Sequence, residues 1–132
     1  MEDLIKITED MEKAKSLLKM AETKERMLSS TKKEFSSQIV EGYYDVIKEL
    51  ITAVLCIDGY KTLSHKTLIE YLKINYKQFN GYETAFIDKL RIIRNRISYD
   101  GFFVGVDYLE RNETKMKPII NKLKEIINKK LK

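Results

Sequence analysis

Apolar residues recur every three or four positions along most of the chain, which is the spacing of amphipathic α-helices. The first such stripe consists of Leu4, Ile7, Met11, Ala14, Leu18, Ala21 and Leu28. Its heptad-like spacing, with Glu and Lys between the apolar positions, predicts a first helix of about 25 residues. This helix would pack either within the monomer or against a second copy of the chain.

The same periodicity predicts a second and a third helix, separated by residues that favour turns. Apolar positions from Phe35 to Ile57 form the second helix. Gly59 is expected to end it, because glycine tolerates the left-handed conformation common at helix C-termini. Thr62 or Ser64 would then cap a shorter third helix, since either hydroxyl can accept a hydrogen bond from the first helical turn.

Two more helices are predicted on either side of a short apolar loop, GFFVG. The fourth follows a turn at Asn80-Gly81 and ends at residues 99–101. Its apolar face is expected to hold Phe86, Leu90, Ile93 and Ile97. The fifth begins near Val106, and Pro118 should kink or divide it because proline lacks the backbone N–H.

Composition agrees with an all-helical fold. The 132 residues include only 5 glycines and 1 proline, too few for the many turns of a β-sandwich or barrel. Five helical segments with short connections predict an all-α, antiparallel up-and-down bundle. The length is that of a single domain, spanning residues 1–132.

The net charge and the small number of metal-binding side chains limit the classes of function that are expected. A net charge of +5 is compatible with an anionic partner such as nucleic acid or nucleotide. Cys56 and His65 are the only cysteine and histidine, so neither a metal site nor another cofactor is expected. The N-terminus lacks the apolar core of a signal peptide, and no stretch reaches the roughly 18 apolar residues of a membrane span. A cytoplasmic protein without membrane contact is therefore expected.

Within the predicted fourth helix, residues 94–99, RNRISY, are mostly polar. On a helix, Arg91, Arg94, Asn95 and Ser98 form a stripe beside the apolar face, where long side chains can line a groove. Guanidinium groups suit phosphate, since their fork donates two hydrogen bonds. Tyr99 would point away from Arg94 on an ideal helix, but fraying at residues 100–101 would turn it toward the same cleft.

The chain from about Tyr43 to its C-terminus resembles a HEPN domain, a small all-helical family of prokaryotic toxin–antitoxin and defence systems. The likeness lies in YYDVIKELITAVLCIDGY, LSHKTLIEYL and KLRIIRNRISYDG. The hallmark of the family is an arginine, a polar residue directly after it, and a histidine four to six residues further on. Arg94 and Asn95 match the first two elements, and Tyr99 stands where the histidine is expected.

This resemblance implies RNA chemistry at Arg94, Asn95 and Tyr99, which would be the catalytic candidates. HEPN ribonucleases resemble metal-independent enzymes in which the ribose 2′-hydroxyl attacks the adjacent phosphate, so they need groups that exchange protons near pH 7. Histidine does so, whereas a tyrosine hydroxyl with a pKa near 10 is ionised in about one molecule in a thousand. Little or no ribonuclease activity is therefore expected, and Tyr99 would position a phosphate or stack on a base.

His65, in the first turn of the third helix, is a secondary candidate for ligand binding. HEPN proteins often have a histidine at that place, although a packing or capping residue is the simpler interpretation. The resemblance further implies a homodimer in which two motif copies share one cleft, and a minimal nucleotidyltransferase as protein partner.

Three functions follow, in order of preference. The first is a HEPN-like protein that binds RNA or nucleotide without cleaving it. The second is a structural or interaction module in which Arg94 pairs with a carboxylate such as Asp88 or Asp100. The third is a ribonuclease toxin that uses Arg94 with Tyr99 or His65.

Overall fold

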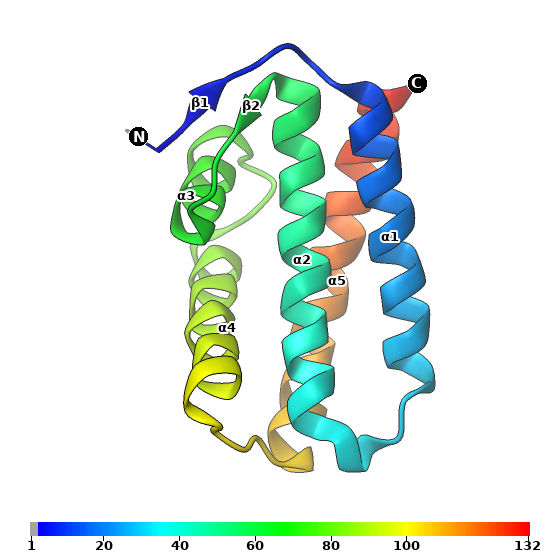
Figure 1. The fold of residues 1–132 in the computed structure, drawn as a ribbon, viewed down its shortest axis with the longest axis vertical. Coiled ribbons are helices and arrows are strands. Elements are labelled where there is room, and N and C mark those ends of the chain that lie inside the picture. Colours follow the sequence, from blue (N-terminus) through cyan, green and yellow to red (C-terminus); the bar gives the residue numbers. More distant parts are fainter. Residues whose placement is uncertain (1–2) are drawn as a thin grey trace.

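The computed structural model describes residues 3–132, and it confirms an all-α bundle of five helices (Figure 1). The helices are α1 (Met11–Ser30), α2 (Ser36–Asp58), α3 (His65–Asn75), α4 (Gly81–Asp100) and α5 (Val106–Leu131). A short 3-10 helix, η1 (Lys33–Phe35), precedes α2. Helices α1 and α4 run in one direction, and α2 and α5 run in the other, with the short α3 near one end of α4.

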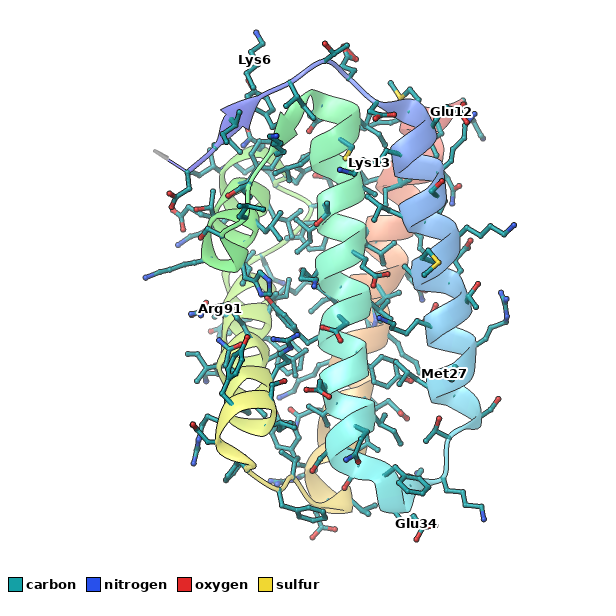
Figure 2. The ribbon with its side chains drawn as sticks, in the orientation of Figure 1. Lys6, Glu12, Lys13, Met27, Glu34 and Arg91 are labelled. Carbon is teal, nitrogen blue, oxygen red and sulfur yellow. The ribbon has the colours of Figure 1, made fainter. Side chains whose placement is uncertain are left out.

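Helix α2 is the centre of the bundle. It packs against α1, α5, α3 and α4, and side chains fill the space between it and these neighbours (Figure 2). Most of its side chains are buried, among them Tyr43, Tyr44, Ile47, Leu50, Ile51 and Leu55. Burial of such apolar groups stabilises a fold by roughly 1.5–3 kcal/mol for each large side chain, so α2 makes the largest contribution to the core.

The first helix is shorter than its heptad-like pattern predicts. Helix α1 begins at Met11, whereas Leu4 and Ile7 lie in an extended segment that includes the strand β1 (Ile5–Lys6). This strand pairs antiparallel with β2 (Tyr60–Lys61). The backbone N–H of Ile7 donates to the carbonyl of Gly59, at 2.9 Å. The extended segment thus supplies partners to the C-terminal end of α2, which a continued α1 could not do.

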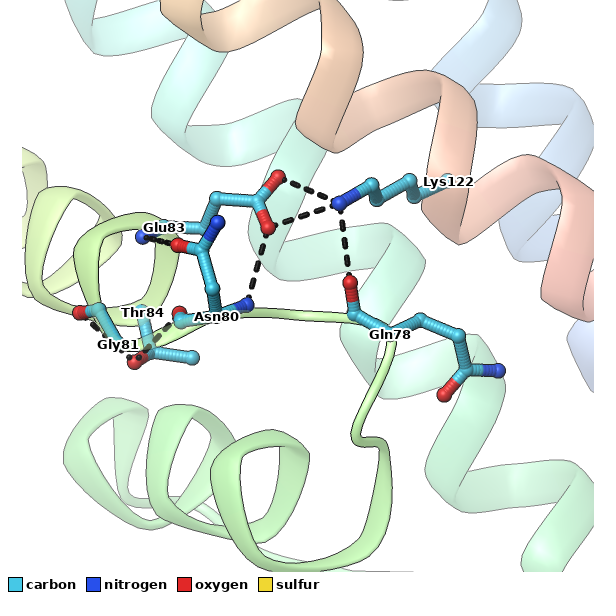
Figure 3. A network of polar contacts seen from close by, with 6 residues as sticks. All are labelled: Gln78, Asn80, Gly81, Glu83, Thr84 and Lys122. Atoms are coloured by element: carbon cyan, nitrogen blue, oxygen red, sulfur yellow. Dashed lines mark hydrogen bonds and ion pairs between the residues drawn. The ribbon is translucent and has the colours of Figure 1, made fainter.

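Side-chain caps fix where α3 and α4 begin. Ser64 caps α3, as predicted, by accepting a hydrogen bond from the backbone of Thr67 at 3.2 Å. Asn80 is the N-cap of α4 rather than part of a separate turn, and its side chain accepts from the Glu83 backbone. Glu83 in return accepts from the Asn80 backbone, and Lys122 of α5 binds the same carboxylate at 2.8 Å (Figure 3). This network ties the start of α4 to α5.

The buried face of α4 is rotated from the predicted one. Its buried residues are Thr84, Ile87 and Leu90. Of the four predicted apolar positions only Leu90 is fully buried, while Phe86, Ile93 and Ile97 are partly buried at the edge of the core. The rotation places residues 91, 94 and 98 on the continuation of the buried face.

Helix α5 is continuous through Pro118, so of the two effects predicted for this proline, a kink or a division, the division is wrong. Pro118 and residue 114, whose carbonyl loses its helical partner, both lie on the exposed side. Water can therefore hydrogen-bond that carbonyl. The loop before α5 is held by Val104, whose backbone N–H donates to Ser37 Oγ at 2.8 Å and whose carbonyl accepts from Ser36 Oγ at 2.5 Å.

Two glycines with positive φ allow a test of the contact between Ile7, which follows β1, and Gly59, the C-cap of α2. Gly59 has φ 86°, and a Cβ added there would lie 3.1 Å from the carbonyl oxygen of Ile7, whereas at Gly101, with φ 66°, it would meet nothing within 4 Å. We expect Gly101→Ala to lower the free energy of unfolding by about 1 kcal/mol, the cost of the left-handed conformation alone. Gly59→Ala should cost about 2 kcal/mol, because the clash with Ile7 is added.

Urea denaturation of both variants measures this difference. Equal losses at the two positions would contradict the close packing of Ile7 against Gly59.

Candidate functional site

The buried face of α4 becomes polar in its second half. Arg94 follows Ile87 by seven residues and therefore lies on the same side of the helix. The side chains of Arg91 and Arg94 are only 20% and 17% exposed. Arg94 pairs with Asp45 of α2, and the charges of both arginines act on Tyr44 of α2 and His65 of α3. Lys48 of α2 also acts on His65. We call these six residues, Arg91, Arg94, Tyr44, Asp45, Lys48 and His65, the arginine cluster.

Arg94 pairs with Asp45 of α2 rather than with the predicted Asp88 or Asp100. Its Nη2 lies 3.5 Å from Asp45 Oδ1, and the Asp45 side chain is 22% exposed. Within residues 3–132, both Arg94 Nε and Asp45 Oδ1 are buried without a hydrogen-bond partner. The ion pair is therefore loose, and Arg94 retains unused hydrogen-bond donors.

Arg91 forms an ion pair with a residue of its own helix, α4. Its Nε donates to Asp88 Oδ1 at 3.0 Å, one turn earlier on α4, and Figure 2 labels it on the side of the bundle formed by α4. Asp88 is thus a partner of the cluster, but of Arg91 and not of Arg94. Both carboxylates restrict the motion of the guanidinium groups and also offset their charge, so an incoming phosphate would compete with them.

His65 joins the cluster through Tyr44. The Tyr44 hydroxyl lies 3.2 Å from His65 Nδ1, and the donor of this hydrogen bond depends on the tautomer of the histidine. Burial raises the pKa of Tyr44 to about 12, although Arg91 and Arg94 act in the opposite direction. Burial lowers the pKa of His65 below 6.5, and the charges of Lys48 and Arg94 lower it further. At neutral pH the Tyr44 hydroxyl is therefore protonated and His65 is uncharged.

The other predicted site residues lie at the edge of the cluster or away from it. Ser98 Oγ donates a hydrogen bond to a carboxylate oxygen of Glu41 on α2, and Asn95 is partly buried beside Arg94. Tyr99 is 77% exposed. The predicted fraying is wrong, since α4 is helical through Asp100. Five residues correspond to about 140° around a helix, so Tyr99 points away from Arg94.

The contribution of α2 to the arginine cluster is not among the features predicted from the sequence. Glu41, Tyr44, Asp45 and Lys48 are spaced by three, one and three residues, which places them on one side of a helix. On a largely apolar helix, such a polar stripe is a signal that another element supplies partners. None of these four residues is among the site residues predicted from the sequence.

The described part of the chain holds no group of three or more His, Cys, Asp or Glu side chains arranged to bind a metal ion. In residues 3–132, no helix is both long enough and apolar enough to cross a membrane.

Comparisons of the chain with protein-family models, with curated proteins and with solved structures each find no match. The arginine cluster combines confined cations, a neutral histidine and a tyrosine hydroxyl.

The lowered pKa of His65 predicts a pH-dependent stability. A histidine with a lower pKa in the folded state binds its proton more weakly there than in the unfolded chain. Its contribution to stability is thus complete above pH 6.5 and is lost as the pH falls through the folded pKa. We expect wild type to lose more stability between pH 7.5 and 5.5 than His65→Gln, with a slope difference of at most about 1.4 kcal/mol per pH unit.

Chemical denaturation at several pH values measures both slopes. Identical slopes in the two proteins would show that His65 is not confined next to Lys48 and Arg94.

Proposed function

We propose that this protein binds RNA or a nucleotide through its arginine cluster and does not cleave the ligand. The observation that carries the proposal is the low exposure and incomplete hydrogen bonding of the Arg94 side chain. Its side chain is 17% exposed, is restrained by a loose 3.5 Å ion pair, and keeps a buried Nε without a hydrogen-bond partner in the described chain. A restrained guanidinium with unused donors is well prepared to bind a phosphate, because little conformational entropy is lost on binding.

The surroundings of Arg94 favour a phosphate ligand over a neutral one. Arg91 and Lys48 provide two more cations, and the Tyr44 hydroxyl remains a neutral donor because its pKa is raised to about 12. The chain as a whole carries +5, which assists the approach of a polyanion. An RNA or nucleotide phosphate would replace Asp45 as the partner of Arg94.

Binding without cleavage follows from the distribution of proton-transfer groups. Cleavage by the 2′-hydroxyl requires a base and an acid on opposite sides of one phosphate. Tyr99 points away from Arg94, and the pKa of Tyr44 is too high for it to act as a base near pH 7. Within one copy of the chain His65 alone remains, so one of the two roles has no candidate there.

The similarity of residues 94–99 to the HEPN motif supports two further parts of this proposal. Two copies of the chain would join as a homodimer and bring two arginine clusters to one RNA. A minimal nucleotidyltransferase would be the protein partner in a toxin–antitoxin or defence system. Both parts rest on the motif, and the first is tested by the mass of the protein in solution.

Two other functions each have one observation in their favour. The ion pair between Arg94 and Asp45 agrees with a structural module in which these residues only join α4 to α2. The neutral, hydrogen-bonded His65 close to Arg94 agrees with a ribonuclease that uses His65 rather than Tyr99 as its base. The experiment below separates all three.

Binding of a fluorescently labelled single-stranded RNA by wild type, Arg94→Ala and Asp45→Asn tests the proposal. Arg94→Ala should weaken binding about 10- to 100-fold, the equivalent of one charge-assisted contact. Asp45→Asn should strengthen it several-fold, because a competing carboxylate is removed. Arg94→Lys should fall between wild type and Arg94→Ala, since lysine keeps the charge but lacks the fork. Titrations at about 50 and 200 mM salt with metal chelated check the electrostatic origin.

Arg26→Ala is the matched control, because Arg26 is an exposed arginine on α1, across the bundle from α4. If Arg94→Ala bound RNA as well as Arg26→Ala does, the proposal would be wrong. A structural module predicts that Arg94→Ala and Asp45→Asn both lose roughly 1–3 kcal/mol of stability without any change in RNA binding. RNA cleavage that disappears in Arg94→Ala and His65→Ala would instead identify the protein as a ribonuclease.

A further inference from the structure

A groove runs between α4 and α5 on the side of α4 that faces away from the arginine cluster. Both helices pack against α2, and two adjoining hollows of about 440 and 310 Å³ separate them. The two hollows share Tyr82, Phe86 and Lys115, so they form one continuous surface. We call it the α4–α5 groove.

The periodicity of α4 places this groove far from the arginine cluster. Phe86, Lys89 and Ile93 line the groove and fall within about 60° of one another on a helix. The side of the helix that carries Arg91 and Arg94 lies roughly 140° away. The groove is therefore a second surface, and its use does not depend on RNA binding.

The floor of the groove is apolar. Phe86 and Ile93 from α4 lie opposite Tyr108 and Ile119 from α5. Of these four, Ile119 is fully buried, and the other three are only partly buried at the edge of the core. Apolar and aromatic surface along about three helical turns is the kind of groove that receives the apolar face of another helix.

The rim of the groove is cationic. Lys89 and Lys115 are exposed and line it, and Lys115 Nζ lies 5.8 Å from the centre of the Phe86 ring. Glu83 is the one carboxylate among the lining residues described. Lys122 binds it with both carboxylate oxygens within 2.9 Å (Figure 3). The groove therefore presents two lysines whose charge no lining carboxylate neutralises.

We propose that the α4–α5 groove binds an amphipathic helix of a partner protein, with apolar side chains on its floor and Asp or Glu at Lys89 and Lys115. Charge complementarity carries this choice of occupant. A second copy docked on a two-fold axis through the groove would bring the same lysines together, which is repulsive. RNA bases fit the groove less well, because Lys115 already covers the Phe86 ring on which a base would stack.

Selection from a displayed library of helical peptides, with purified wild-type protein as bait, tests the proposal. The selected peptides should be acidic and amphipathic, and a synthetic copy should bind at least 10-fold more weakly to Lys89→Glu/Lys115→Glu. The variant Lys19→Glu/Lys117→Glu has the same net charge, with both changes at exposed positions outside the groove, and should bind like wild type. Tyr82→Ala, at a side chain that is 89% exposed, should also weaken binding.

Each other outcome overturns the proposal. Selected peptides without an excess of Asp and Glu, or no enrichment at all, would exclude an acidic helix as the occupant. Equal binding to the two double variants would place the peptide outside the groove. Single-stranded RNA binding lost in Lys89→Glu/Lys115→Glu but kept in Arg94→Ala would make the groove a nucleic-acid surface. A dimer that dissociates in Tyr82→Ala would make it a contact between copies of the chain.

Discussion

Partial burial of ionisable side chains on α2 is the constraint on which the rest of this structure depends. The central helix is surrounded by its neighbours, yet it carries Glu41, Asp45, Lys48, Glu49 and Asp58 among its apolar residues. A charge away from water is costly unless another group pairs with it. Every helix that packs on α2 therefore has to present a partner at the right height, and these partners fix the register of the bundle.

The pairs observed follow this requirement on both sides of α2. On the side of α1, Lys24 donates to Glu49 at 3.1 Å. At the C-terminal end, Asp58 accepts hydrogen bonds from Tyr71 at 2.7 Å and from Tyr76 at 2.5 Å, and Lys130 of α5 lies 3.2 Å from its other oxygen. On the side of α4, Ser98 binds Glu41. These contacts leave little freedom in how α1, α3, α4 and α5 are placed.

The pair between Asp45 and Arg94 differs from these contacts because it is loose. Its 3.5 Å separation and the partnerless Nε leave Arg94 restrained but incompletely bound. A well-paired arginine would serve the fold alone, and an exposed one would lose more entropy on binding a ligand. Arg94 is more restrained than an exposed arginine and less completely hydrogen-bonded than a well-paired one. This combination connects the packing of α2 to a function in phosphate binding.

Much of this fold could be predicted from the sequence, because periodicity and caps act locally. Helices α2 to α5 begin and end close to the predicted residues, and Ser64 and Gly59 have their predicted roles. The errors come from interactions between distant segments. Residues 5–7 leave the helical pattern because the end of α2 needs backbone partners. The rotation of α4 places Arg94 beside Asp45 of α2, a contact between distant segments that helical periodicity does not predict. Asp45 could not be paired with Arg94 from sequence, since 49 positions separate them.

The most direct measurement of the role of Arg94 is the NMR signal of its Nε–H group in ¹⁵N-labelled wild-type protein, recorded during titration with single-stranded RNA. A buried Nε–H should exchange slowly with water and give a resolved signal before RNA is added. We predict that this signal shifts progressively with RNA and saturates together with the bound fraction. Saturation of the protein with RNA while the Arg94 signal stays in place would contradict the claim that this arginine binds the phosphate.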